Sequence, residues 1–76
     1  MRRTPEITLP LRLDRDSLEP LPAQLAAGLR DLVRNGVLAP GDALPSTRAL
    51  ADHLDVSRGT VVAGYDQLLA EGYLSA

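Results

Sequence analysis

Residues 46–62 of this 76-residue chain read STRALADHLDVSRGTVV, and they indicate the fold because they contain two helix starts separated by a turn. Ser46 and Ser57 each stand directly before a run of helical periodicity. A serine is a favoured N-cap because its side-chain oxygen accepts a hydrogen bond from a free N–H of the first turn. A short helix, a turn of about three residues at Asp55-Val56 and a longer capped helix form the outline of a helix-turn-helix.

The two helices of this outline are expected to turn different faces to the core. In the shorter one Leu50 and Leu54 point inward, while Asp52 and His53 face water. The longer helix runs to about Glu71, with Gly72 as its stop. On a helical wheel of about 100° per residue, its core arc is predicted to hold Val61, Val62, Tyr65, Leu68 and Leu69. Its outer arc is predicted to hold Thr60, Ala63, Gly64 and Gln67, with Gly59 at the margin.

Small residues on that outer arc are unusual for a helix that only faces solvent. A helical glycine costs about 1 kcal/mol relative to alanine, so Gly59 and Gly64 indicate a backbone that comes close to a partner. Arg58 stands at the helix start, where free N–H groups and the helix dipole favour an anion. A helix start carrying Ser57, Arg58 and Thr60 suits insertion into a DNA major groove.

Each of these residues also has a purely structural interpretation, which the sequence leaves open. Ser57 is a helix cap, Arg58 is compatible with a solvated surface arginine, and Arg48 is placed to pair with Asp52 four residues further along its helix. DNA binding gains weight only from the combination of the capped helices, the turn and the smooth outer face.

Upstream of residue 46 the sequence predicts one further helix preceded by an arm. The helix starts near Pro22, a favoured first helical residue, and ends at Asn35-Gly36. Its apolar stripe is Leu21, Leu25, Leu29, Leu32 and Val33. A tight turn is expected at Gly41-Asp42, and an extended tail from Tyr73.

The arm is predicted from an alternating pattern. Ile7, Leu9, Leu11 and Leu13 alternate with polar residues or proline, which is typical of a half-buried strand. Pro10 has no N–H, so the segment is either an edge strand or an extended arm laid on a groove. We therefore divide the chain into an arm, residues 1–20, and a folded domain, residues 21–76.

Composition excludes several classes of function. Aromatic residues make up 3% of the chain and cysteine is absent, so an aliphatic helical core without disulfides or thiolate metal sites is expected. No apolar run approaches the roughly 18 residues of a membrane span, and the first residues do not resemble a signal peptide. A cytoplasmic single domain without membrane contact is therefore expected. His53, near Asp52 and Asp55, forms neither a metal set nor a nucleophile–base pair, so no enzymatic activity is expected.

The charge pattern requires any anion site to be local. All eight basic residues are arginine, and the net charge is −2. This net charge argues against a broad, nonspecific nucleic-acid binder. The absence of lysine also excludes chemistry that needs a lysine amine.

Three stretches resemble the GntR family of bacterial transcription regulators. They are residues 36–51 (GVLAPGDALPSTRALA), 56–62 (VSRGTVV) and 65–74 (YDQLLAEGYL), and the resemblance covers about residues 21–76. The ending, and LRLDR at residues 11–15, resemble the MocR/PdxR-type subfamily in particular.

The resemblance implies a mainly α (small α+β) winged helix-turn-helix of three helices with short strands, whose wing is incomplete at Ala76. It implies binding to double-stranded operator DNA as a homodimer or on paired half-sites, with a recognition helix of about residues 58–71 in the major groove. The effector is left unknown. By motif position, the implied DNA-binding residues are Ser46, Thr47, Arg48, Ser57, Arg58, Gly59 and Thr60.

The sequence departs from the family pattern at the turn, where Asp55 replaces the usual glycine. Aspartate tolerates the left-handed conformation better than most residues, so we expect the turn to persist. MocR-type relatives carry a C-terminal domain that binds pyridoxal phosphate, and without lysine this chain cannot hold that cofactor covalently. The alternative function is a winged-helix module that binds another protein and no DNA.

Overall fold

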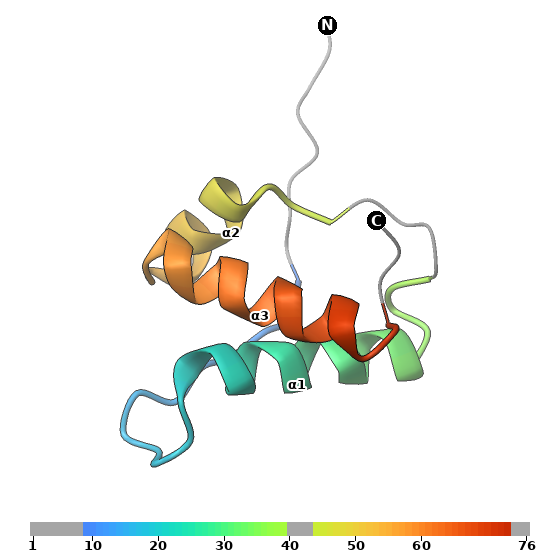
Figure 1. The fold of residues 1–76 in the computed structure, drawn as a ribbon, viewed down its shortest axis with the longest axis horizontal. Coiled ribbons are helices and arrows are strands. Elements are labelled where there is room, and N and C mark those ends of the chain that lie inside the picture. The colour runs from blue at the N-terminus through green and yellow to red at the C-terminus, as the bar shows by residue number, and fades with distance from the viewer. Residues whose placement is uncertain (1–8, 40–43, 74–76) are drawn as a thin grey trace, which may run out of the picture.

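The computed structural model describes residues 9–39 and 44–73, which form three helices, arranged as in Figure 1. They are α1 (Leu21–Arg34), α2 (Thr47–Leu54) and α3 (Arg58–Ala70). Helix α3 packs along α1 and also contacts α2, which lies across its N-terminal end. The mainly α fold is confirmed, and the two described ranges contain no β-strand. The turn expected at Gly41-Asp42 and the tail after Tyr73 lie outside the described residues.

The core is aliphatic, as the composition predicts. Its largest fully buried side chains are Leu25, Leu29, Leu50, Val61 and Leu68. No polar or charged side chain is buried among the described residues, so packing of branched aliphatic groups is what holds the helices together. None of the described helices is long and apolar enough to cross a membrane.

The arm before α1 is extended but forms no strand where the structure describes it. Leu9, Leu11 and Leu13 are half-buried against the core, while Pro10 and Arg12 are exposed. Leu11 lies against α1, because a Cβ at Gly28 would stand 2.8 Å from Leu11 Cδ2. The alternating pattern therefore corresponds to an arm that packs on the helices. The edge-strand alternative is wrong for residues 9–13.

All three helices end in the same way, with one residue in the left-handed region. These residues are Gly36 (φ 82°), Asp55 (φ 58°) and Gly72 (φ 83°). In each case the amide that follows bonds back to a carbonyl of the last turn: Val37 to Leu32, Val56 to Ala51, and Tyr73 to Leu68. This is the Schellman arrangement, for which glycine is the preferred left-handed residue. The predicted ends of α1 and α3 are confirmed, and Asp55 does adopt the turn conformation.

The wheel assignment of α3 needs a correction at three positions. Gly64 is buried against α1, whereas Val62 and Leu69 are 39% and 41% exposed. Gly64 follows Val61 by three residues and precedes Leu68 by four, so the three share one face of the helix. The close approach that Gly64 allows is therefore between α3 and α1, and not between α3 and an outside partner.

Candidate nucleic-acid interface

The two serine caps are formed as predicted. Ser46 Oγ accepts a hydrogen bond from the Ala49 amide at 3.0 Å, and Ser57 Oγ accepts one from the Thr60 amide at 3.1 Å. The hydroxyls of Ser57 and Thr60 are also 3.0 Å apart, and Thr60 is half-buried. The structural interpretation of Ser57 is thus correct, and its hydroxyl is oriented by the helix that it starts.

Arg58 and Gly59 form the exposed surface next to that cap. Arg58 is the first residue of α3, and the first turn of this helix contains no acidic side chain. A Cβ at Gly59 would meet nothing nearer than Ser57 Oγ, at 3.8 Å, so the surface beside Arg58 is smooth and open. A flat, cationic helix start of this kind favours an anionic partner at close range.

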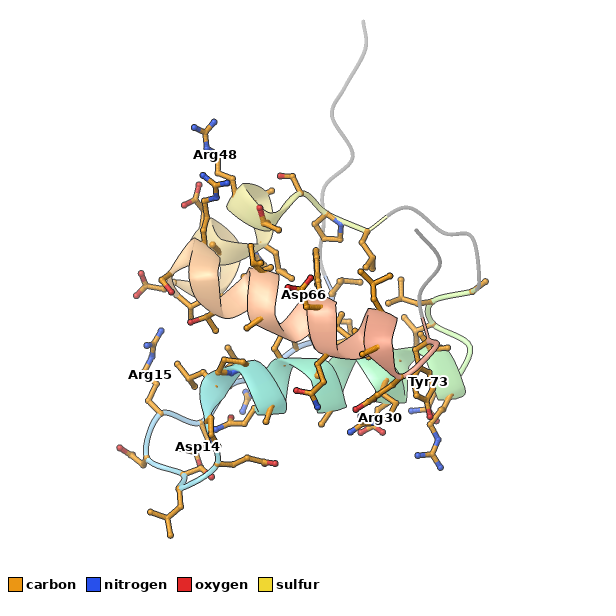
Figure 2. All side chains as sticks on the ribbon, in the orientation of Figure 1. Asp14, Arg15, Arg30, Arg48, Asp66 and Tyr73 are labelled. Atoms are coloured by element: carbon orange, nitrogen blue, oxygen red, sulfur yellow. The ribbon has the colours of Figure 1, made fainter. Side chains whose placement is uncertain are left out.

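Arg48 occupies the exposed side of α2, where Figure 2 shows it pointing away from the body of the molecule. Next to it lie the exposed cap Ser46 and the half-buried Thr47. Within residues 9–39 and 44–73 the ion pair is Arg30–Glu71, so neither Arg48 nor Arg58 is paired with Asp52 or Asp55. The pairing of Arg48 with Asp52, which the spacing left open, is therefore not formed.

His53 and its acidic neighbours lie on the surface of α2. His53 and Asp52 are exposed, as predicted. The described part of the chain holds no group of three or more His, Cys, Asp or Glu side chains placed to bind a metal ion.

Tyr65 holds the segment before α2 against α3, a role that sequence reasoning missed by counting this residue only as core. Its hydroxyl donates to the Pro45 carbonyl oxygen at 2.8 Å. Burial raises the pKa of Tyr65 to about 12, because the phenolate would lose solvation there. Since Pro45 directly precedes the Ser46 cap, this bond positions the start of α2.

Tyr65→Phe is expected to lower the free energy of unfolding by about 0.5–1.5 kcal/mol, the net contribution of one hydrogen bond. The raised pKa means that the folded state prefers the neutral phenol, so this contribution is complete below pH 10 and is lost as the pH rises toward 12. Urea unfolding at neutral pH and at pH 11 measures both effects. An equal loss of stability at alkaline pH in Tyr65→Phe and in the wild type would contradict the assignment.

A polar network fixes the opposite end of α3. Arg30 Nη1 lies 2.7 Å from Glu71 Oε1, and Gln67 Nε2 donates to Glu71 Oε2 at 3.2 Å. The hydrogen bond from Gln67, and to a smaller extent that from Arg30, holds the pKa of Glu71 below its usual value. Arg30 also lies over the Tyr73 ring, 5.9 Å from its centroid. The network ties the end of α3 to α1 at the point where the chain leaves the three helices.

An aliphatic three-helix core that presents α2, a tight turn and the open cationic start of α3 defines a helix-turn-helix domain of the DNA-binding kind. The chain belongs to the GntR family: the family model for bacterial regulatory proteins of the gntR family matches residues 21–76. These residues are the helix-turn-helix DNA-binding domain of a GntR-type transcription regulator.

Relatives and a solved structure agree with this assignment. The chain is 52% identical over 67 residues to the pyridoxine biosynthesis transcriptional regulator PdxR of Corynebacterium glutamicum, covering 88% of this chain and 15% of PdxR. It is 48% identical to the probable rhizopine catabolism regulatory protein MocR of Rhizobium meliloti, covering 87% of this chain and 13% of MocR. The GntR-family transcription factor YtrA from Sulfolobus acidocaldarius superposes with a TM-score of 0.84 at 38% identity, over 87% of this chain and 70% of YtrA. Over these residues the chain is thus similar to two regulators of the MocR/PdxR type.

Proposed function

We propose that the chain binds operator DNA by placing the start of α3 in the major groove, with α2 across the phosphate backbone. The observation that supports this most strongly is the exposure of Arg48 and Arg58, which no acidic side chain neutralises within residues 9–39 and 44–73. Arg58 would then bond a guanine edge, and Arg48 a phosphate. Arg48 and Arg58 both lie on the helix-turn-helix, where a chain of net charge −2 would need its local anion site.

The remaining predicted contacts have supporting roles in this proposal. Gly59 lets the helix backbone approach the base edges, since no side chain stands between it and the groove. Ser46 and Thr47 would face the phosphates at the start of α2, and Ser57 and Thr60 those at the start of α3. All seven residues belong to α2, α3 or their caps.

We further propose that the full-length regulator acts as a cytoplasmic homodimer on two half-sites. One turn of DNA, about 10–10.5 base pairs, or a multiple of it would separate them. The chain spans only 15% and 13% of the lengths of PdxR and MocR. Any pyridoxal phosphate would belong to a further domain of the full-length protein, because these 76 residues contain no lysine.

Binding of the wild-type chain to DNA tests the proposal directly. A duplex is first recovered by selection from a random-sequence pool, and binding to it is compared with binding to a scrambled duplex at two salt concentrations. We expect tighter binding to the selected duplex, and affinity that falls as salt rises because phosphate contacts release counterions. Equal, weak binding to both duplexes would refute the proposal and favour the protein-interaction alternative.

Arg48→Ala is expected to weaken binding to the selected and the scrambled duplex by similar factors. If Arg48 neutralises one phosphate, the plot of log affinity against log salt concentration loses about 0.9 from its slope. Titrations at several salt concentrations measure this slope. An unchanged slope, or a loss confined to the selected duplex, would contradict a phosphate contact.

A further inference from the structure

The loop between the arm and α1 is held by one glutamine. Gln24 Oε1 accepts a hydrogen bond from the Asp14 amide at 2.7 Å. Gln24 Nε2 donates to the carbonyl oxygens of Asp14 at 2.9 Å and of Glu19 at 2.7 Å. Residues 14–19 are thereby attached to the first turns of α1, and Arg15 extends from a fixed base.

From this base Arg15 reaches the helix-turn-helix turn. Its Nη2 donates to the carbonyl oxygen of Asp55 and to that of Leu54, the latter at a distance of 3.4 Å. Asp55 and Leu54 lie 40 and 39 positions further along the chain. Figure 2 shows Arg15 extending from the loop toward the end of the molecule where α2 meets α3. The two acceptors are carbonyls at the end of α2 that have no partner within that helix.

This contact lies at the end of α2. Within residues 9–39 and 44–73, it is the one helix end whose left-handed residue is not glycine. Gly36 and Gly72 adopt that conformation without cost, but Asp55 carries a Cβ. Arg15 bonds the carbonyls on either side of the Asp55 backbone. The positive charge of Arg15 also interacts favourably with the partial negative charge at the C-terminal end of α2.

We infer that Arg15 is a positioning residue for DNA recognition: it holds the left-handed turn at Asp55 and thereby the orientation of α3 relative to α2. The inference rests on the proposed function. The turn between the two helices is only Asp55-Val56-Ser57, so the orientation of its peptides determines where Arg58 lies relative to Arg48. Arg15 acts through the turn and contacts no DNA itself.

Arg15→Gln tests the inference against Arg12→Gln, which removes the same charge from the same arm. Arg12 is exposed and makes no side-chain hydrogen bond to any described residue. Binding is measured on the selected and scrambled duplexes, at a temperature where circular dichroism shows each variant to be folded. We expect Arg15→Gln to lose about fivefold to tenfold in affinity for the selected duplex, part of the value of one base contact. Its salt slope and its binding to scrambled DNA should match those of Arg12→Gln.

Two further variants separate positioning from simple stabilisation. Arg15→Lys keeps a donor near the carbonyls and should recover most of the lost affinity. Asp55→Gly removes the cost of the left-handed turn, so adding Arg15→Gln to it should cost much less than in the wild type. An equal loss in both backgrounds would overturn the role in the turn.

The remaining outcomes distinguish this inference from the proposed function. A salt slope reduced by about 0.9 in Arg15→Gln alone would mean that Arg15 itself contacts a phosphate, which overturns the inference. A lower melting temperature with unchanged affinity would reduce Arg15 to a structural role and also overturn it. If the wild type does not discriminate between the duplexes, the proposed function fails and the inference falls with it.

Discussion

Leu25→Ala is expected to lower the free energy of unfolding by about 2–5 kcal/mol, the usual cost of removing a buried leucine side chain. Leu25 is 0% exposed and lies on α1 at its contact with α3. Small domains are stable by only about 5–15 kcal/mol, so this loss would unfold a measurable fraction of the molecules. Urea denaturation followed by circular dichroism measures the change.

Leu25 packs directly against Gly64 of α3, so a second substitution at Gly64 tests the contact between α1 and α3. A Cβ at Gly64 would lie 2.8 Å from Leu25 Cδ2 and 3.1 Å from its Cγ, so Gly64→Ala overpacks the wild-type interface. Overpacking costs about 1–3 kcal/mol, against a gain of up to about 1 kcal/mol from helix propensity. In the Leu25→Ala background both of these atoms are gone, leaving Leu25 Cβ at 3.3 Å.

We therefore expect Gly64→Ala to be less destabilising, or even stabilising, when Leu25 is already alanine. Gly59→Ala is the matched control, since its nearest neighbour would be Ser57 Oγ at 3.8 Å. It should not destabilise the chain in either background. Strictly additive effects of Gly64→Ala and Leu25→Ala would show that the two residues are not in contact.

Arg58→Ala is expected to reduce affinity for the selected duplex by about 1–3 kcal/mol, the value of one bidentate contact to a base. Arg58 stands at the open start of α3, so its loss removes a donor without disturbing the buried core. Preference at one base pair should relax, because the guanine would lose its specific partner. Titrations on duplexes substituted at single positions identify that base pair.

The control for Arg58→Ala is Arg34→Ala, which removes an exposed arginine from the last turn of α1. It changes the net charge equally but leaves the proposed interface intact. We expect little change in specific affinity for Arg34→Ala. Similar losses for both variants would mean that only the overall charge matters, and Arg58 would not be a base-reading residue.

The starts and ends of the helices could be predicted from the sequence, because these signals act over a few residues. Serine caps at Ser46 and Ser57 and the stop at Gly72 depend on hydrogen bonds within one turn, and all are found where predicted. The candidate arginines could be placed for the same reason, since each lies one or two residues after a cap. Composition was also sufficient to predict an aliphatic core, because aromatic residues make up only 3% of the chain.

Which surfaces meet could not be predicted, because it depends on residues far apart in the sequence. The alternation in residues 9–13 fits both a strand and an extended arm, and the choice depends on whether another strand lies beside it. A helical wheel puts Gly64 on the outer face of α3, whereas its close approach to Leu25 lies in the interface with α1. The bond from Tyr65 to Pro45 and those from Arg15 to the turn join residues 20 to 40 positions apart. No local pattern encodes such contacts, because they exist only once the helices have packed.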